Sequence, residues 1–257
     1  MEKRTRVKKA YDNPEFLHGR SARHLRVLAE FIEPEERLKK YGISNTIVFF
    51  GSSHSVDTVT FRKQKLNKKI VSEKAFKVSK SHDACTELAK RITAWSQKIE
   101  EPSKRFYVCS GGGSGVMEAA NKGAKLAGGK SIGFNITLPH DQSLNPYITP
   151  ELCFDFHYFF IRKFWFLYYA KALIGFPGGF GTMDEVFELL TLLQTRKILK
   201  QVPVVLFNGT FWNEVVNFKA LQEYGVINPG DLKLFKIIDT VDEAFEYITE
   251  QLTELYL

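Results

Sequence analysis

Short apolar runs, each followed by a segment of helical periodicity, recur along this chain from residue 46 onward. Seven runs are rich in aliphatic, β-branched and aromatic residues, and they cover residues 46–53, 105–110, 131–136, 153–159, 172–176, 202–207 and, more weakly, 232–238. The runs are apolar throughout rather than alternating, which is typical of strands buried on both faces. The pattern therefore predicts a parallel sheet.

Helical segments fill the gaps between these runs. An apolar stripe at steps of three and four marks residues 85–99, and further helices are expected at residues 114–126, 160–171, 183–196, 211–224 and 241–255. Strands that alternate with helices are covered by those helices on both faces of the sheet. We expect an α/β protein with a Rossmann-like, doubly wound parallel sheet.

Two parts of the chain fall outside this alternation. Residues 1–42 read as a polar N-terminal arm followed by a helix, and residues 43–257 read as one nucleotide-binding domain. Residues 54–80 hold eight Lys or Arg residues against Asp57 and Glu73, so they carry much of the net charge of +7. We interpret them as a solvated basic insertion. A nucleic-acid partner is the alternative, and we do not expect one.

The composition also bears on location. The basic N-terminus is followed by no apolar stretch of the kind found in secretory signals. The aromatic segment 156–176 is interrupted by Arg162, Lys163 and Lys171, so we expect a buried helix feeding a strand and no membrane partner. The three cysteines form no CxxC pair, and the histidines do not group at metal-ligand spacings. We expect a cytoplasmic protein without a metal site.

Two glycine-rich stretches each follow a predicted strand and open a predicted helix. They are CSGGGSGVMEAA at residues 109–120 and FPGGFGTMDE at residues 176–185. Such a turn points free backbone N–H groups and the positive end of a helix dipole at a ligand, which suits a phosphate. Glycine lets the backbone approach closely, although it also simply permits tight turns. Both interpretations are open for either loop alone.

Two familiar nucleotide motifs do not fit. Val116 stands where the dinucleotide pattern GxGxxG needs its last Gly or Ala, and Ala124 stands where the P-loop needs a glycine. The second loop also carries Thr182 and Glu185, which have the spacing of a capping box. Glu185 is thus either a helix cap or an acid beside a phosphate site.

The stretches SGGGSGVMEAANKGA, FIRK and PGGFGTMDE together resemble the LOG family, the cytokinin riboside 5′-monophosphate phosphoribohydrolases, over about residues 47–238. Many members were once labelled "possible lysine decarboxylase". The resemblance implies hydrolysis of the N-glycosidic bond of a nucleoside 5′-monophosphate such as AMP, with no metal or organic cofactor and in a dimer or larger assembly. It implies that Arg162 and Glu185 are the catalytic pair.

The same resemblance places the nucleotide in the glycine loops. The candidate binding residues are Gly51, Ser52, Ser110, Gly111, Gly112, Gly113, Ser114, Gly115, Glu118, Lys163, Gly178, Gly179, Gly181 and Thr182. A carboxylate can stabilise the positive charge that develops on the ribose and deprotonate the attacking water, and a guanidinium can hold that carboxylate or the phosphate. The chain departs from short members at Phe159 and Phe160, where they carry Met and His, so the pocket for the base differs.

Alternative functions stay open. A nucleotide or molybdenum-cofactor carrier on the same fold would keep the phosphate loops and bind without cleaving. A pyridoxal phosphate decarboxylase needs a Schiff-base lysine, and no lysine stands in a suitable context. The apolar helix FFIRKFWFLYYA is expected to be buried on more than one side, and a second copy of the chain is one such neighbour.

Overall fold

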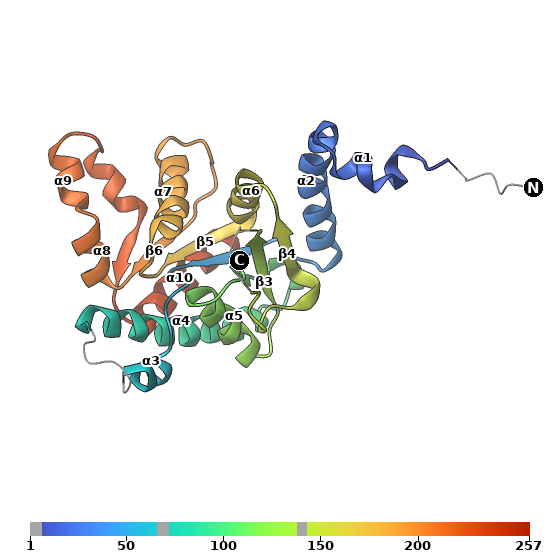
Figure 1. Ribbon diagram of the computed structural model, residues 1–257. Coiled ribbons are helices and arrows are strands. Elements are labelled where there is room, and N and C mark those ends of the chain that lie inside the picture. The colour runs from blue at the N-terminus through green and yellow to red at the C-terminus, as the bar shows by residue number, and fades with distance from the viewer. Residues whose placement is uncertain (1–6, 66–71, 138–142) are drawn as a thin grey trace, which may run out of the picture.

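The computed structural model describes residues 7–65, 72–137 and 143–257, and these residues form a parallel sheet between two layers of helices (Figure 1). The strand order is β4-β3-β2-β1-β5-β6-β7, and every pair is parallel. The strands are β1 (Thr46–Phe50), β2 (Tyr107–Ser110), β3 (Ser131–Ile136), β4 (Cys153–Phe156), β5 (Ala170–Gly175), β6 (Val204–Phe207) and β7 (Lys236–Ile238). All seven predicted strands and the doubly wound sheet are confirmed.

The chain reverses its direction of travel across the sheet next to β1. It first builds outward through β2, β3 and β4, and then returns to place β5 on the other side of β1. In doubly wound sheets the loops separate at such a reversal and leave a crevice at the carboxyl ends of the strands. The fold therefore places a ligand site above β1.

Two apolar cores lie on the two faces of the sheet. One core packs beneath α4 (Glu73–Gln97), α5 (Val116–Leu126) and α10 (Val241–Tyr256), and the other beneath α2 (Arg23–Lys40), α6 (Phe159–Tyr169), α7 (Phe180–Gln194), α8 (Gly209–Val215) and α9 (Phe218–Glu223). Within β1, Ile47 and Phe49 enter the first core, whereas Val48 and Phe50 enter the second. This alternation is the period of two that strand geometry dictates.

The predicted helices differ from the observed ones in their bounds, and two of these differences change how the elements connect. The segment expected as one helix at residues 211–224 is broken into α8 and α9, because the Asn217 side chain accepts a hydrogen bond from the Ala220 N–H at 2.9 Å and starts a new helix. The segment expected at residues 160–171 stops at Tyr169, and β5 begins at the next residue. The expected buried helix that feeds a strand is confirmed.

Lys200 supports this abrupt change from α6 to β5. Its Nζ donates hydrogen bonds to the carbonyl oxygens of Leu167 and Tyr168 at 2.6 and 2.8 Å, which satisfies acceptors at the end of α6. Burial, with a smaller contribution from Lys171, lowers the pKa of Lys200 to about 8. The contact holds the end of the helix that carries Arg162.

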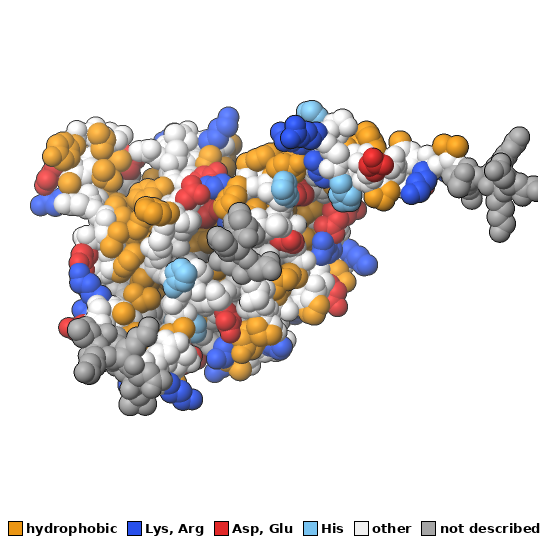
Figure 2. Space-filling model, viewed as in Figure 1, with side chains coloured by type: hydrophobic (Ala, Val, Ile, Leu, Met, Phe, Trp, Pro, Cys, Tyr) orange, Lys and Arg blue, Asp and Glu red, His pale blue; other side chains and the backbone are white. Residues whose placement is uncertain are grey.

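The N-terminal part leaves the body of the molecule. Helix α2 packs against α6, where the Trp165 indole donates to the Glu30 carbonyl at 2.8 Å, but α1 (Pro14–His18) projects away from the sheet (Figure 1). Figure 2 shows hydrophobic as well as Lys and Arg side chains along this projection. Among them, Val7 and Tyr11 are 90% and 66% exposed.

The basic stretch does not form a separate unit in the described residues. Its first part contains α3 (Thr58–Lys65), which packs on α4, and residues 73–80 are already the first turns of α4. Residues 66–71 lie outside the described residues. Short 3-10 turns complete the structure at Ala10–Asp12, Arg20–Ala22, Pro102–Lys104, Pro150–Leu152 and Pro229–Leu234. None of the helices in the described ranges has the length and apolar character needed to cross a bilayer.

The close packing of α4 on α5 predicts a strong effect of Gly123→Ala. A Cβ at Gly123 would lie 2.3 Å from the Thr86 carbonyl oxygen, so the two helices must separate to admit it. We expect the free energy of unfolding to fall by about 2 kcal/mol in urea titrations. Gly230→Ala is the matched control, because a Cβ there meets nothing within 4 Å. Equal stability of the two variants would contradict the assigned packing.

Candidate active site

The two glycine-rich loops lie on either side of the loop that follows β1. The Ser52 N–H donates to the Pro177 carbonyl at 3.0 Å, and the Ser52 carbonyl accepts from the Val116 N–H at 3.0 Å. The Ser114 hydroxyl donates to the Ser53 carbonyl at 2.8 Å. Three loops from three strands therefore meet at one edge of the sheet, as the sequence predicts for a shared site.

Some glycines are required by contacts between these loops. Gly115 has a φ of +69°, and a Cβ there would lie 2.2 Å from the Ser52 carbonyl oxygen. A Cβ on Gly178 would lie 2.2 Å from the Thr182 hydroxyl, and one on Gly51 would lie 2.6 Å from the Val116 side chain. These three glycines allow the loops to pack against each other.

Other glycines face open space. A Cβ on Gly179 or Gly181 would meet nothing within 4 Å, so packing within the chain does not explain either glycine. Both residues line a cleft of about 320 Å³ above β1. The two interpretations of the second loop are thus divided between its residues: packing accounts for Gly178, whereas Gly179 and Gly181 leave backbone exposed to the cleft.

The cleft brings together eight of the predicted site residues and leaves eight out. It is lined by Gly51, Ser52, Gly111, Arg162, Gly179, Gly181, Thr182 and Glu185. The predicted residues that do not line it are Ser110, Gly112, Gly113, Ser114, Gly115, Glu118, Lys163 and Gly178.

Side chains outside the cleft fix the first glycine-rich loop through hydrogen bonds. The buried Ser110 hydroxyl accepts from the Gly112 N–H at 3.1 Å and donates to Asn121 Oδ1 at 2.7 Å. Asn145 Nδ2 donates to the carbonyl oxygens of Gly112 and Gly113, both at 3.0 Å. The sequence analysis did not single out Asn145 because it lies far along the chain from the loop that it holds.

Lys163 is turned away from the cleft. Its Nζ lies 2.8 Å from Asp184 Oδ2 and 2.6 Å from Glu188 Oε2, on the outer side of α7. Glu118 lies on α5 and does not line the cleft. Lys163 comes directly after Arg162 on α6, and Glu118 lies three residues after Gly115, but the helical period carries both side chains off the face that borders the cleft.

Glu185 and Arg162 form a buried pair at one wall of the cleft. Their side chains are 2% and 14% exposed, and Arg162 Nη2 lies 3.9 Å from Glu185 Oε1. Within the described residues, Glu185 Oε2 and Arg162 Nε have no hydrogen-bond partner. Burial raises the pKa of Glu185 to about 7, against the opposing charges of Lys163 and Arg162. A carboxyl with this pKa can take up and release a proton near neutral pH.

The capping-box interpretation of Glu185 is wrong. Helix α7 begins at Phe180 with Gly179 as its N-cap, so Thr182 lies inside the first turn and no side chain caps this end. The Glu185 carboxylate lies one turn further on, where it borders the cleft. Its position satisfies no backbone N–H, which leaves the acid available to a ligand.

The cleft also contains residues that were not predicted. They are Phe50, Ser53, His54, Met117, Ile136, Phe159 and Phe180. The turn GSSH carried a signal for Ser53 and His54, because they follow Gly51 and Ser52 at the carboxyl end of a strand. Phe159 lies in the cleft as one of the two departures from short LOG members, whereas Phe160 is 58% exposed outside it.

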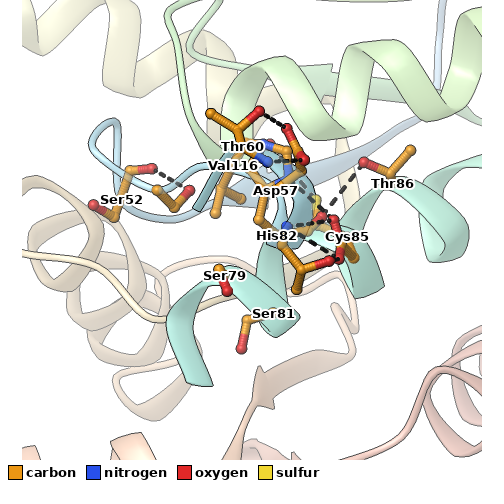
Figure 3. A network of polar contacts seen from close by, with 12 residues as sticks. Ser52, Asp57, Thr60, Ser79, Ser81, His82, Cys85, Thr86 and Val116 are labelled. Atoms are coloured by element: carbon orange, nitrogen blue, oxygen red, sulfur yellow. Dashed lines mark hydrogen bonds and ion pairs between the residues drawn. The ribbon is translucent and has the colours of Figure 1, made fainter. Parts of the chain in front are cut away.

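Polar contacts hold the loop that follows β1. The His54 N–H donates to the Ser52 hydroxyl and the Ser55 hydroxyl donates to the Ser52 carbonyl, both at 3.1 Å. Asp57 accepts hydrogen bonds from the Thr60 N–H and hydroxyl at 2.8 and 2.7 Å at the start of α3 (Figure 3). The loop therefore has a defined path between β1 and α3.

No group of three or more His, Cys, Asp or Glu side chains within residues 7–65, 72–137 and 143–257 could hold a metal ion. The chemistry of the cleft is carried by one carboxyl, one guanidinium, one imidazole and the free N–H groups at the start of α7. This set can bind an anion and move protons.

A family model described as "Possible lysine decarboxylase" matches residues 117–248. The probable cytokinin riboside 5′-monophosphate phosphoribohydrolase LOG4 of Oryza sativa subsp. japonica is 27% identical over 145 residues, 56% of this chain and 62% of the relative. The cytokinin riboside 5′-monophosphate phosphoribohydrolase LOG5 of Arabidopsis thaliana is 27% identical over 158 residues, 60% of this chain and 63% of the relative. The matches thus span less than two thirds of each relative.

Among solved structures, the X-ray structure of TM1055 is similar in fold, with a TM-score of 0.50. It is 23% identical in sequence, and the match covers 80% of this chain and 99% of the other.

Because Glu185 is buried, we expect the free energy of unfolding to depend on pH, and we expect Glu185→Gln to reduce this dependence. Between pH 4.5 and about 7 the folded carboxyl keeps a proton that the unfolded chain has lost, so the folded state binds more protons and stability falls as pH rises. The shift from 4.5 to about 7 corresponds to about 3 kcal/mol.

Urea titrations at pH 5 and pH 8 measure this effect. The loss of stability between the two pH values should be smaller in Glu185→Gln than in the wild-type protein. Asp184→Asn serves as the control, because this neighbouring carboxylate is 54% exposed. The same loss in all three proteins would contradict the assigned burial of Glu185.

Proposed function

The chain belongs to the LOG family, formerly described as possible lysine decarboxylases, and on this premise we propose that it is a cytoplasmic hydrolase of nucleoside 5′-monophosphates. It would cleave the N-glycosidic bond of AMP or a cytokinin riboside 5′-monophosphate to give free base and ribose 5-phosphate. The observation that carries the proposal is Glu185, a buried carboxyl with one unpartnered oxygen in a cleft that also holds exposed glycine backbone.

The phosphate of the substrate binds at the start of α7. The first N–H groups of a helix have no partner within it, and the helix dipole adds positive potential there. Gly179 and Gly181 carry no side chain to keep an anion at a distance, and Thr182 adds a hydroxyl to the same wall of the cleft. A phosphate at this end of α7 brings the attached ribose close to Glu185, one turn into the helix.

Glu185 acts on the water and on the ribose. Cleavage of the ribosyl–base bond develops positive charge on the sugar, which an ionised carboxylate stabilises while it removes a proton from the attacking water. With a pKa of about 7, Glu185 is ionised in a large fraction of molecules at neutral pH and is still basic enough to accept that proton. The charges of Lys163 and of Arg162, whose Nη2 lies 3.9 Å from Glu185 Oε1, favour the charged form of the carboxylate.

We expect Glu185→Gln to reduce the release of free base from AMP by at least about 100-fold, because the amide can neither accept the proton nor stabilise positive charge. Chromatography of the reaction with AMP and with other nucleoside monophosphates measures the product. Asp184→Asn is the matched control, since this acid pairs with Lys163 outside the cleft. It should retain wild-type turnover.

The outcomes separate the hydrolase from the carrier. Unchanged turnover in Glu185→Gln would remove the proposed role of that carboxylate. Tight binding of nucleotides by the wild-type protein without any release of base would favour a non-catalytic carrier on the same fold.

We also propose that the protein is a homodimer or a larger homo-oligomer. Helix α6 buries Ile161, Trp165 and Phe166 but leaves Phe160, Phe164 and Tyr168 exposed by 58%, 39% and 54%. These rings line a groove of about 440 Å³ together with Leu192, Ile198 and Leu199. A second copy of the chain would remove this apolar surface from water.

Light scattering tests the oligomer. We expect the wild-type protein to have at least twice the mass of the chain, and the double change Phe160→Glu and Phe164→Glu to lower it to that of a monomer. Phe16→Glu in the projecting arm is the control for an exposed aromatic residue elsewhere. A wild-type monomer at micromolar concentration would exclude the assembly.

A further inference from the structure

Hydrolysis of an N-glycosidic bond also requires a proton for the leaving base, and the proposed mechanism so far names no group that donates it. The bond breaks with its electron pair on the leaving base, and a purine departs readily only when a ring nitrogen receives a proton. Glu185 is occupied with the attacking water. Catalysis of the whole reaction therefore calls for an acid elsewhere in the cleft.

Few described residues of the cleft can supply this proton. The titratable side chains that line it are His54, Arg162 and Glu185. A guanidinium does not release its proton in proteins, so Arg162 is excluded as the donor. Glu185 cannot remove a proton from the water and give one to the base in the same step, because these two groups lie on opposite sides of the anomeric carbon. His54 remains.

The position of His54 suits this role. It comes from the loop after β1, whereas Arg162 and Glu185 come from α6 and α7. Its side chain is exposed to solvent while it lines the cleft, so it can be protonated again after each turnover. Histidine is the side chain that most often serves as a general acid or base in enzymes.

The backbone of His54 is held in place. Its N–H is bonded to the Ser52 hydroxyl, and the next residue, Ser55, is 6% exposed and bonded to the Ser52 carbonyl. After Ser55 the loop enters α3, where the Asp57 carboxylate accepts hydrogen bonds from the Thr60 N–H and hydroxyl (Figure 3). Ser52 itself is tied to the loops after β2 and β5. A proton donor gains from such a rigid support.

We propose that His54 is the general acid that protonates the leaving base. This inference rests on the proposed hydrolysis of a nucleoside 5′-monophosphate. The observation behind it is that the exposed His54 and the buried Glu185 line the same cleft.

The step balances as follows. The C1′–N bond breaks and its electron pair moves to the base, and the His54 imidazolium gives its proton to a ring nitrogen of that base. Water adds to C1′ and loses a proton to the Glu185 carboxylate. The products are neutral base and ribose 5-phosphate, and solvent returns the proton from Glu185 to His54.

Two substrates with different leaving groups test the proposal. AMP needs a proton on its base, whereas 4-nitrophenyl β-D-ribofuranoside 5-phosphate releases a stable phenolate without one. We expect His54→Asn to lower kcat/KM for AMP by about 100-fold and to change that for the nitrophenyl substrate by less than about 3-fold. His24→Asn, an exposed histidine on α2, is the matched control.

Each outcome bears on the proposal. An equal loss with both substrates would show that His54 binds the ribose phosphate or supports the fold, and unchanged turnover of AMP would show that it has no part in the reaction. Either result overturns the general-acid role and leaves the proposed function intact. A wild-type protein that cleaves neither substrate would remove the proposed function, and this inference with it.

Discussion

The site depends on one close contact, the packing of the loop after β1 between the two glycine-rich loops. Ser52 is bonded through its N–H to the loop after β5 and through its carbonyl to the start of α5. A single Cβ on Gly115 or Gly178 would fill the space in which these backbones meet. Because the three loops are locked together, the groups that they carry border one cleft with a defined geometry.

The same architecture keeps the Glu185 carboxyl buried, and this burial lowers the stability of the folded protein when the carboxyl is ionised. Glu185 lies in the first turns of α7, and the charges of Lys163 and of Arg162, 3.9 Å away, offset only part of the penalty of removing its own charge from water. Residues that are strained or poorly satisfied in the folded state are typical of functional sites. The unpartnered Oε2 of Glu185 and Nε of Arg162 fit that pattern.

Under the proposed function, phosphate binding and bond cleavage fall to different segments along the cleft. The start of α7 offers backbone N–H groups, Glu185 lies one turn further along α7 beside Arg162 of α6, and the loop after β1 contributes His54. Phe159 and Ile136 add apolar surface. A base lies more favourably against such side chains than against charged ones, and Phe159 is a residue at which this chain departs from the short LOG members.

Local sequence patterns were sufficient to predict the fold and the region of the candidate site. Strand and helix periods are properties of neighbouring residues, so the seven strands, the parallel sheet and the position of both glycine loops at its carboxyl edge follow from the sequence. Arg162 and Glu185 could be named because the FIRK and PGGFGTMDE stretches resemble a family.

Tertiary structure decided which of the named residues reach the cleft. Helical rotation turns Lys163 toward Asp184 and Glu188, packing assigns Gly115 and Gly178 to contacts between loops, and Ser110 is enclosed beneath its own loop. The burial that raises the pKa of Glu185, and the inclusion of His54, depend on segments that are distant in the chain. Distances and burial of this kind are set only when those segments pack together, and no local pattern encodes them.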